Sequence, residues 1–116
     1  NPLLVAGQVH GGIVQGLGQA MCEHAIYDET GQLLNGSYMD YQMPRADDFP
    51  HFNIDFNEEA ECTTNLLGAK GCGEAGTVAS TTAYVNAIIN ALNDFDTQKL
   101  NMPITAQKVW GIINNA

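Results

Sequence analysis

Apolar residues recur at steps of three and four in two long stretches of this sequence. An α-helix has about 3.6 residues per turn, so this spacing predicts helices over residues 8–25 and 75–92. The positions are Val9, Ile13, Leu17 and Ala20 in the first stretch, and Ala75, Val78, Ala79, Thr82, Val85, Ile89 and Leu92 in the second. A short last helix is predicted to begin after Thr105, a favourable N-cap residue, and to run through Ile113.

Strands are predicted between the two long helices. Phe52, Ile54 and Phe56 alternate with polar residues, which is typical of a strand with one buried face. Residues 24–28 predict a second strand, and residues 33–34 with 38–43 a third. Residues 1–6 are expected to form a loop or strand. Together these elements predict an α+β fold over residues 1–116, with a small mixed or antiparallel sheet, two longer helices and a short C-terminal helix.

The first predicted helix is unusually rich in glycine. Each glycine inside a helix costs about 0.5–1 kcal/mol relative to alanine, so a cluster implies that the backbone must come close to something. The spacing alone favours tight packing against another helix over a ligand-facing surface. The residues concerned are Gly7, Gly11, Gly12, Gly16 and Gly18.

Composition limits the classes of function. The formal charge is −9, with four Lys and Arg against thirteen Asp and Glu, which argues against nucleic acid or an anionic membrane as a partner. No stretch approaches a membrane span. Three cysteines without a C-x-x-C pair favour reduced thiols in a cytoplasmic protein. The abrupt, apolar opening of the sequence suggests a piece of something longer.

Residues 70–77, Lys-Gly-Cys-Gly-Glu-Ala-Gly-Thr, carry the clearest candidate chemistry. Glu74 is a lone carboxylate among three glycines at the start of a predicted helix. It could simply favour the helix dipole or pair with Lys70, but the glycines remove bulk around it without helping the helix to form. The G-x-G-x-x-G spacing resembles a dinucleotide-binding loop, yet that motif needs a strand on each side of the helix. The sequence leaves no room for the second strand.

Other polar residues give weaker signals. His10, His24 and His51 have no spacing typical of metal ligands, so no metal-ligating side chain is expected. Cys72 stands near a helix start, which can activate a thiol, but no histidine nearby could serve as its base.

Four segments resemble the large, molybdenum-binding subunit of the xanthine dehydrogenase/aldehyde oxidase family, and they occur in the family's order. They are Gly7-Gln8-Val9-His10-Gly11-Gly12 with its continuation to Ala20, Tyr38-Met39-Asp40-Tyr41-Gln42-Met43-Pro44-Arg45 with its continuation to Asp48, Leu67-Gly68-Ala69-Lys70-Gly71-Cys72-Gly73-Glu74-Ala75-Gly76-Thr77, and Met102-Pro103-Ile104-Thr105 through Trp110. The resemblance implies the C-terminal portion of a molybdopterin-binding domain.

The resemblance also implies roles for particular residues. Glu74 matches the family's catalytic base, which takes a proton from water-derived oxygen while an aldehyde or a purine-like N-heterocycle is hydroxylated. Gln8 matches a cofactor contact. The remaining residues expected to line the cofactor are Gly11, Gly12, Gly71, Cys72 and Gly73.

The expected cofactor is a molybdenum-pyranopterin, either molybdopterin itself or its cytosine dinucleotide. Expected partners are the remainder of the large subunit, iron–sulfur and flavin (FAD) subunits or domains, and a small-molecule substrate. Two alternatives remain open from the sequence: an inactive structural or interaction fragment, and a nucleotide-binding module. If missing segments normally cover residues 52–56, the chain alone is expected to self-associate.

Overall fold

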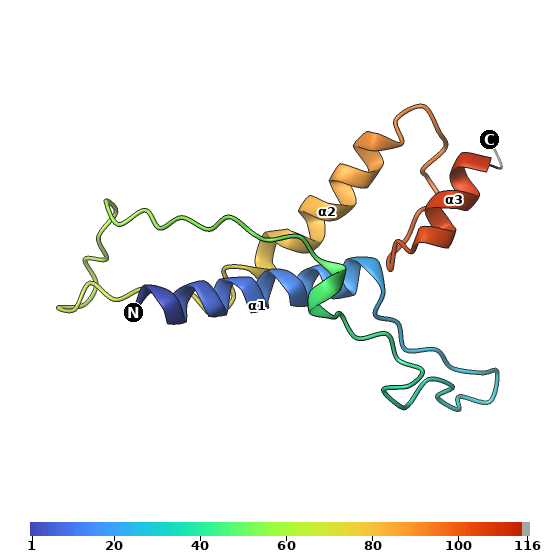
Figure 1. Cartoon of the computed structure of the whole chain (residues 1–116), viewed down its shortest axis with the longest axis horizontal. Coiled ribbons are helices and arrows are strands. Elements are labelled where there is room, and N and C mark those ends of the chain that lie inside the picture. Colours follow the sequence, from blue (N-terminus) through green and yellow to red (C-terminus); the bar gives the residue numbers. More distant parts are fainter. Residues whose placement is uncertain (115–116) are drawn as a thin grey trace.

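The computed structural model describes residues 1–114 as a set of helices joined by long irregular segments (Figure 1). The elements in chain order are α1 (Pro2–Met21), the 3₁₀ turn η1 (Ala46–Asp48), α2 (Thr77–Ala91) and α3 (Ala106–Asn114). Helix α2 crosses the middle of α1, and the segments before and after η1 project away from this crossing. The three predicted helices are confirmed. The crossing of α1 and α2 lies at the centre of the molecule.

Helix α1 begins earlier than the apolar spacing indicated. Residues 1–6 were predicted to be loop or strand, and this is wrong. The side chain of Asn1 accepts a hydrogen bond from the amide of Leu3 at 3.0 Å, and Pro2 occupies the first helical position. Because an N-cap asparagine followed by proline favours helix initiation, the helix starts there. It ends at Met21, before the predicted residue 25.

Helices α2 and α3 lie close to their predicted positions. Helix α2 starts at Thr77 and reaches Ala91, within two residues of the predicted bounds at each end. The Thr105 hydroxyl lies 3.4 Å from the amide nitrogen of Lys108, so Thr105 caps α3 as predicted. Strong apolar periodicity and a good cap residue were sufficient to locate both elements.

The predicted sheet is wrong. Residues 24–28, 33–34, 38–43 and 52–56 form no strand in the part of the chain that the structure describes, apart from one isolated antiparallel bridge between Tyr27 and Leu33. Burial alternates as expected over residues 52–55, since Phe52 and Ile54 are half-buried and Asn53 and Asp55 are exposed, but Phe56 is exposed against the prediction. A strand also needs a neighbour to pair with, and among these segments the structure describes backbone pairing across residues 26–34 alone.

Helices α1 and α2 approach each other through glycine. A Cβ on Gly12 would lie 3.1 Å from the Cα of Gly76 and 3.2 Å from the amide nitrogen of Thr77. A Cβ on Gly76 would collide with the carbonyl of Val9 and would lie 2.7 Å from the amide nitrogen of Ile13. The two backbones are therefore in direct contact, which confirms close packing for Gly12 and Gly16; Gly7 and Gly11 contact no other element.

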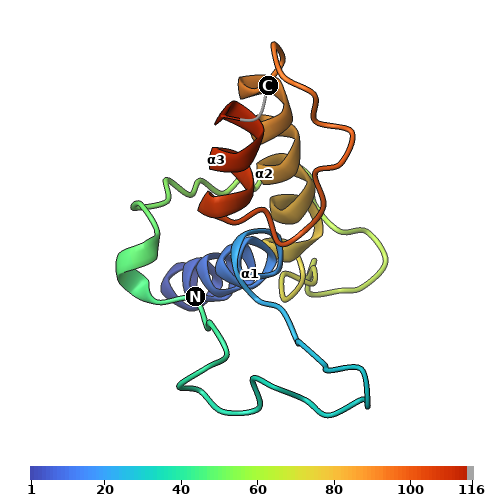
Figure 2. The ribbon, with the colours of Figure 1, turned by 90° about the vertical axis from the view of Figure 1, so that its right-hand side faces the viewer.

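Little apolar surface is buried elsewhere. Only Ala20, Leu92 and Ile104 are buried hydrophobic residues within residues 1–114. Ile104, in the segment before α3, donates its amide to the carbonyl of Ala20 at 2.6 Å, which attaches the α3 region near the end of α1 (Figure 2). Within the described residues, no helix is both long and apolar enough to cross a membrane.

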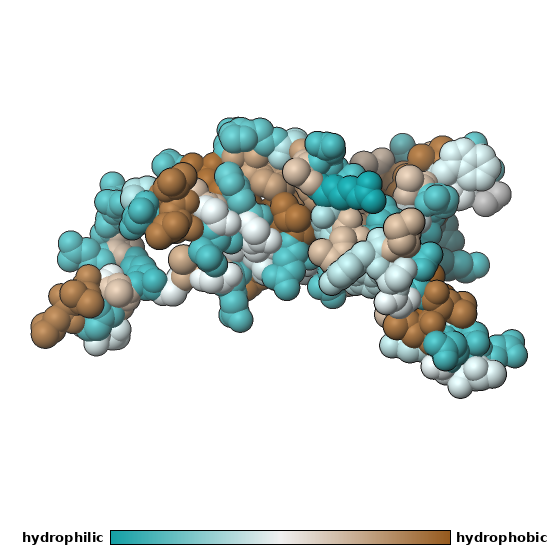
Figure 3. All heavy atoms as spheres, turned by 60° about the horizontal axis from the view of Figure 1, so that its bottom comes forward, coloured by the Kyte–Doolittle hydropathy of each residue, from teal (hydrophilic) through white to brown (hydrophobic). Residues whose placement is uncertain are grey.

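The molecule is extended for its size. Its radius of gyration is 18.1 Å, whereas about 13 Å is typical of a compact domain of this length. Its accessible surface is 9099 Å², roughly 2,900 Å² more than the ~6,200 Å² expected for a folded monomer of this mass. Hydrophobic side chains gather on both projecting ends (Figure 3).

Replacing Gly76 with alanine is expected to destabilise the protein by about 1–3 kcal/mol, because the new methyl group overlaps the α1 backbone. The matched control is Gly7→Ala in α1, where nothing lies within 4 Å of the added Cβ; it should stabilise by about 0.5–1 kcal/mol. Urea unfolding followed by the helical circular dichroism signal measures both. Equal midpoints for the two variants would contradict this packing.

Candidate functional site

Glu74 lies on the loop directly before α2 and is exposed. Its carbonyl accepts hydrogen bonds from the amides of Thr77 at 3.0 Å and Val78 at 3.1 Å, and the amide of Ala75 donates to Cys72 at 3.2 Å. These bonds make Glu74 part of the helix start. Its backbone is held in place, while its carboxylate remains accessible.

The glycines beside Glu74 leave open space. Nothing lies within 4 Å of a Cβ added to Gly71 or to Gly73, so the loop presents bare backbone on this side. The Lys70 ammonium donates to the carbonyl of Ala60, so its hydrogen bond goes to the preceding loop and not to Glu74. The loop is thin and accessible around the carboxylate.

The candidate residues on α1 divide into two groups. Gln8 and Gly11 are exposed, and a Cβ on Gly11 would meet nothing within 4 Å. Gly12 is buried and turned toward Gly76 and Thr77. Residues four apart share a helix face, so Gln8 stands one turn before the point where α1 touches the start of α2. The α1–α2 contact thus brings the Gln8 turn and the Glu74 loop to the same crossing.

His10 lies two residues after Gln8 on α1, and Cys72 lies two residues before Glu74. Cys72 is half-buried. The Nε2 atom of His10 is buried with no hydrogen-bond partner, and its ring lies 5.9 Å from that of Phe52 and 6.3 Å from that of His51, measured between centroids. Among the described residues, no group of three or more His, Cys, Asp or Glu side chains is arranged to hold a metal ion.

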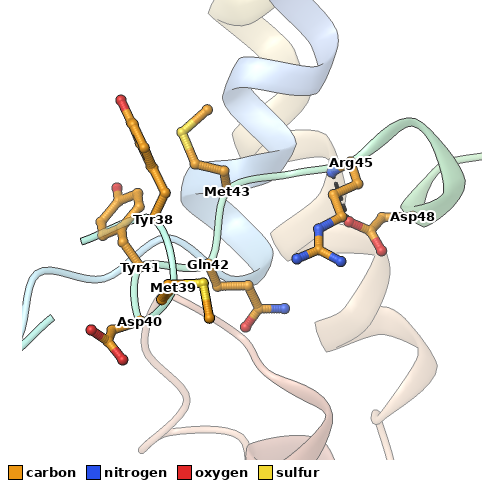
Figure 4. A pocket seen from close by; sticks show the side chains of 8 residues that line it. All are labelled: Tyr38, Met39, Asp40, Tyr41, Gln42, Met43, Arg45 and Asp48. Carbon is orange, nitrogen blue, oxygen red and sulfur yellow. Dashed lines mark hydrogen bonds between the residues drawn. The ribbon is translucent and has the colours of Figure 1, made fainter. Parts of the chain in front are cut away.

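The segment around Arg45 forms a separate, open hollow of about 680 Å³ (Figure 4). The Tyr38 and Tyr41 side chains lie at one end and those of Arg45 and Asp48 at the other, and the Gln42 side chain extends toward Arg45. The amide of Arg45 donates to the Asp48 carboxylate at 2.8 Å, which holds the turn at η1. The residues that line the hollow all come from positions 38–48, so neither the Glu74 loop nor α1 contributes to it.

The loop before Lys70 is organised by Asn65. The Asn65 side-chain oxygen accepts from the amides of Leu67 at 3.1 Å and Ala69 at 3.0 Å, and its amide group donates to the Ala69 carbonyl at 3.0 Å. Gly68 has φ +63°, a conformation that favours glycine. These contacts fold residues 65–69 into a compact turn with Leu66 and Leu67 on its outside.

The cysteine at the start of this turn differs from the cysteine at the end of α1. The Thr64 side chain and backbone hydrogen-bond the Cys62 sulfur and lower the pKa of its thiol. Burial, followed by the charges of Glu23 and Asp48, raises the pKa of the Cys22 thiol. Since the thiolate is the reactive form, the two sites should differ in reactivity.

Two residues of this region were missed by the sequence reasoning. The Thr77 hydroxyl donates to the carbonyl of Gly12 and the Thr81 hydroxyl to that of Gly16, both at 2.9 Å. The signal was present, because two glycines and two threonines each stand four residues apart. Spacing within each helix could not show that the two pairs face each other across 65 residues of chain.

An exposed carboxylate beside bare backbone can accept a proton from a ligand held against this surface. Gly11, Gly71 and Gly73 offer unobstructed backbone to a large group, and Gln8 offers an exposed amide. Exposed backbone and an exposed side-chain amide are groups that could line one side of a cofactor. The described residues do not enclose it.

Comparisons with known proteins identify the family of the chain. A family profile described as a molybdopterin cofactor-binding domain matches residues 1–50. The large subunit of nicotine 6-hydroxylase from Paenarthrobacter nicotinovorans is 39% identical over 109 residues, 94% of this chain and 13% of that protein. The carbon monoxide dehydrogenase large chain of Hydrogenophaga pseudoflava is 34% identical over 110 residues, 95% of this chain and 14% of that one.

The same likeness holds in three dimensions. Quinoline 2-oxidoreductase from Pseudomonas putida 86 superposes with a TM-score of 0.87 at 35% identity, over 97% of this chain and 14% of that one. The structure is thus that of part of a molybdopterin-binding domain. The chain belongs to the family of molybdenum-binding large subunits that includes the xanthine and carbon monoxide dehydrogenases. It spans about one seventh of the length of the relatives compared here.

Alkylation with iodoacetamide at neutral pH is expected to label Cys62 before Cys22, because more of the Cys62 thiol is ionised. Peptide mass spectrometry after brief labelling measures the order. Thr64→Val, which removes a hydrogen bond to the Cys62 sulfur, should slow labelling there and leave Cys22 unaffected. Faster labelling of Cys22 in the unmodified chain would contradict the assigned pKa directions.

Proposed function

We propose that this chain is the part of a molybdenum hydroxylase large subunit that supplies the catalytic base, Glu74. The observation that supports this most is the placement of an exposed carboxylate directly after two unobstructed glycines, Gly71 and Gly73, at the crossing that also carries Gln8. The substrate is an aldehyde or an N-heterocycle. Relatives named for nicotine and quinoline favour the heterocycle.

The proposed reaction is a hydroxylation, in which a C–H bond of the substrate is replaced by a C–O bond whose oxygen comes from water. Glu74 accepts a proton from that oxygen as it attacks, which requires the carboxylate to be within hydrogen-bond reach. Gly71 and Gly73 give the substrate and cofactor clearance to reach Glu74. The molybdenum cofactor, when bound, supplies the redox chemistry and takes up the two electrons released by the substrate.

Residues from both sides of the α1–α2 contact would hold the cofactor. Gln8 would donate from its side-chain amide, and Gly11, Gly71, Cys72 and Gly73 would line the cofactor with backbone and small side chains. Gly12 would act by bringing the α1 backbone against α2. The cofactor is proposed to be molybdopterin or its cytosine dinucleotide.

Electrons must leave through other parts of the protein. Iron–sulfur clusters are held by sets of cysteine thiolates, and this chain has only three scattered cysteines. The proposed partners are therefore iron–sulfur and flavin subunits or domains together with the remainder of the large subunit. A cytoplasmic location accords with the free cysteines.

The chain is proposed to be one portion of a larger domain, the C-terminal portion of the molybdopterin-binding domain. Its excess accessible surface, roughly 2,900 Å², is of the size that obligate interfaces bury. Among exposed hydrophobic residues, Met39 is 93% and Leu67 is 91% accessible. Further chain from the same subunit would cover these surfaces.

Replacing Glu74 with glutamine in the complete subunit is expected to lower kcat by about 10²–10⁴-fold, the usual contribution of a general base. Molybdenum content should remain close to that of the unmodified protein, because glutamine keeps the shape of the side chain. Glu58→Gln, on an exposed loop, is the control and should retain activity. Near-normal turnover of the Glu74 variant would rule out the proposed role.

The isolated 116-residue chain is expected to self-associate, because the hydrophobic side chains at its two projecting ends are exposed. It is also expected to contain no molybdenum, because its residues line only one side of the proposed cofactor site. Light scattering and elemental analysis measure these properties. A strictly monomeric chain would contradict the proposal that its exposed hydrophobic surface is an interface with the remainder of the subunit. Bound molybdenum would show that these residues suffice for the cofactor, against the proposal that the pocket is shared with other segments.

A further inference from the structure

The two hydrogen bonds between α1 and α2 are alike in geometry but differ in position. Each joins a threonine hydroxyl to a glycine carbonyl at 2.9 Å, and each glycine is buried. Thr77 is the first residue of α2, and Thr81 lies one turn later. Only the first bond is directly connected to the Glu74 loop.

The connection runs through a short series of hydrogen bonds. The Gly12 carbonyl accepts from the Thr77 hydroxyl, and the Thr77 amide in turn donates to the Glu74 carbonyl at 3.0 Å. Gly12 stands one turn after Gln8 on α1. Movement of Thr77 away from Gly12 would therefore move Glu74 relative to Gln8.

Close packing makes this connection stiff. The space beside Gly12 is filled by Gly76 and Thr77, at 3.1–3.2 Å from a Cβ placed there. Gly76 provides no capping side chain for α2, since any Cβ would collide with α1. The start of α2 is therefore held to α1 by the hydroxyl of Thr77 and is not stabilised by a side chain at the N-cap position, Gly76.

We infer that Thr77 is a positioning residue for Glu74, and that its hydroxyl sets the placement of the carboxylate relative to the Gln8 turn. This inference rests on the proposed role of Glu74. Thr81 makes an equivalent bond that stabilises the helix pair without acting on the loop. A misplacement of about 1 Å can lower a rate by about 10²-fold, so loss of the Thr77 bond should be visible in kcat.

The test compares Thr77→Val and Thr81→Val in the complete subunit, since each loses one hydroxyl and keeps the side-chain volume. Thr77→Ser retains the hydroxyl and serves as the rescue variant, and Glu74→Gln is measured alongside. Thr77→Ala replaces Thr77→Val if the latter is not produced. The readouts are kcat, KM and hydrogen–deuterium exchange of peptides covering residues 70–78.

For Thr77→Val, kcat is expected to fall at least about tenfold with little change in KM, and exchange over residues 70–78 should rise. Thr77→Ser should stay close to the unmodified protein. Thr81→Val should raise exchange within α2 while leaving kcat and residues 70–78 unchanged.

The inference is overturned if both valine variants change kcat and exchange over residues 70–78 equally, because Thr77 would then be a general stabilising residue. It also fails if Glu74→Gln is inactive while Thr77→Val behaves like the unmodified protein; the proposed function would survive that result. An active Glu74→Gln variant would instead remove the proposed function and the inference that depends on it. Exchange over residues 70–78 would still report whether Thr77 orders the loop.

Discussion

The structure depends on the direct contact of two backbones where α1 meets the start of α2. At this point neither Gly12 nor Gly76 carries a side chain that would hold the backbones apart, and the Thr77 and Thr81 hydroxyls donate to the carbonyls of Gly12 and Gly16. The two helices are joined here by close backbone approach and two hydrogen bonds. Because Glu74 lies two residues before Gly76, the same contact locates the candidate base.

The sequence was most informative where a structural preference is local. Helix α2 and the Thr105 cap follow from periodicity and from hydrogen bonding within a few residues, and both were predicted. The Asn1-Pro2 start of α1 has an equally local cause but was not predicted, because apolar spacing begins only at Val9 and α1 starts with an N-cap asparagine followed by proline.

The strands illustrate what sequence alone could not settle. Phe52 and Ile54 are half-buried while Asn53 and Asp55 are exposed, so the alternation correctly predicted half-burial at these positions but not at Phe56, which is exposed. A segment forms a strand only when the rest of the fold brings a second segment alongside it to share backbone hydrogen bonds. No local sequence pattern specifies that second segment. Similarly, the Glu74 loop was found from its composition, whereas its relation to Gln8 depends on a contact between residues 65 positions apart.

The Asn65 turn has a consequence for assembly. Because Asn65 holds the backbone of residues 65–69 through its own side chain, the turn that carries Leu66 and Leu67 is already shaped before another surface meets it. A preorganised segment loses less conformational freedom on association than a flexible one. If the remainder of the subunit covers Leu66 and Leu67, as proposed, it would meet a turn whose backbone is already ordered.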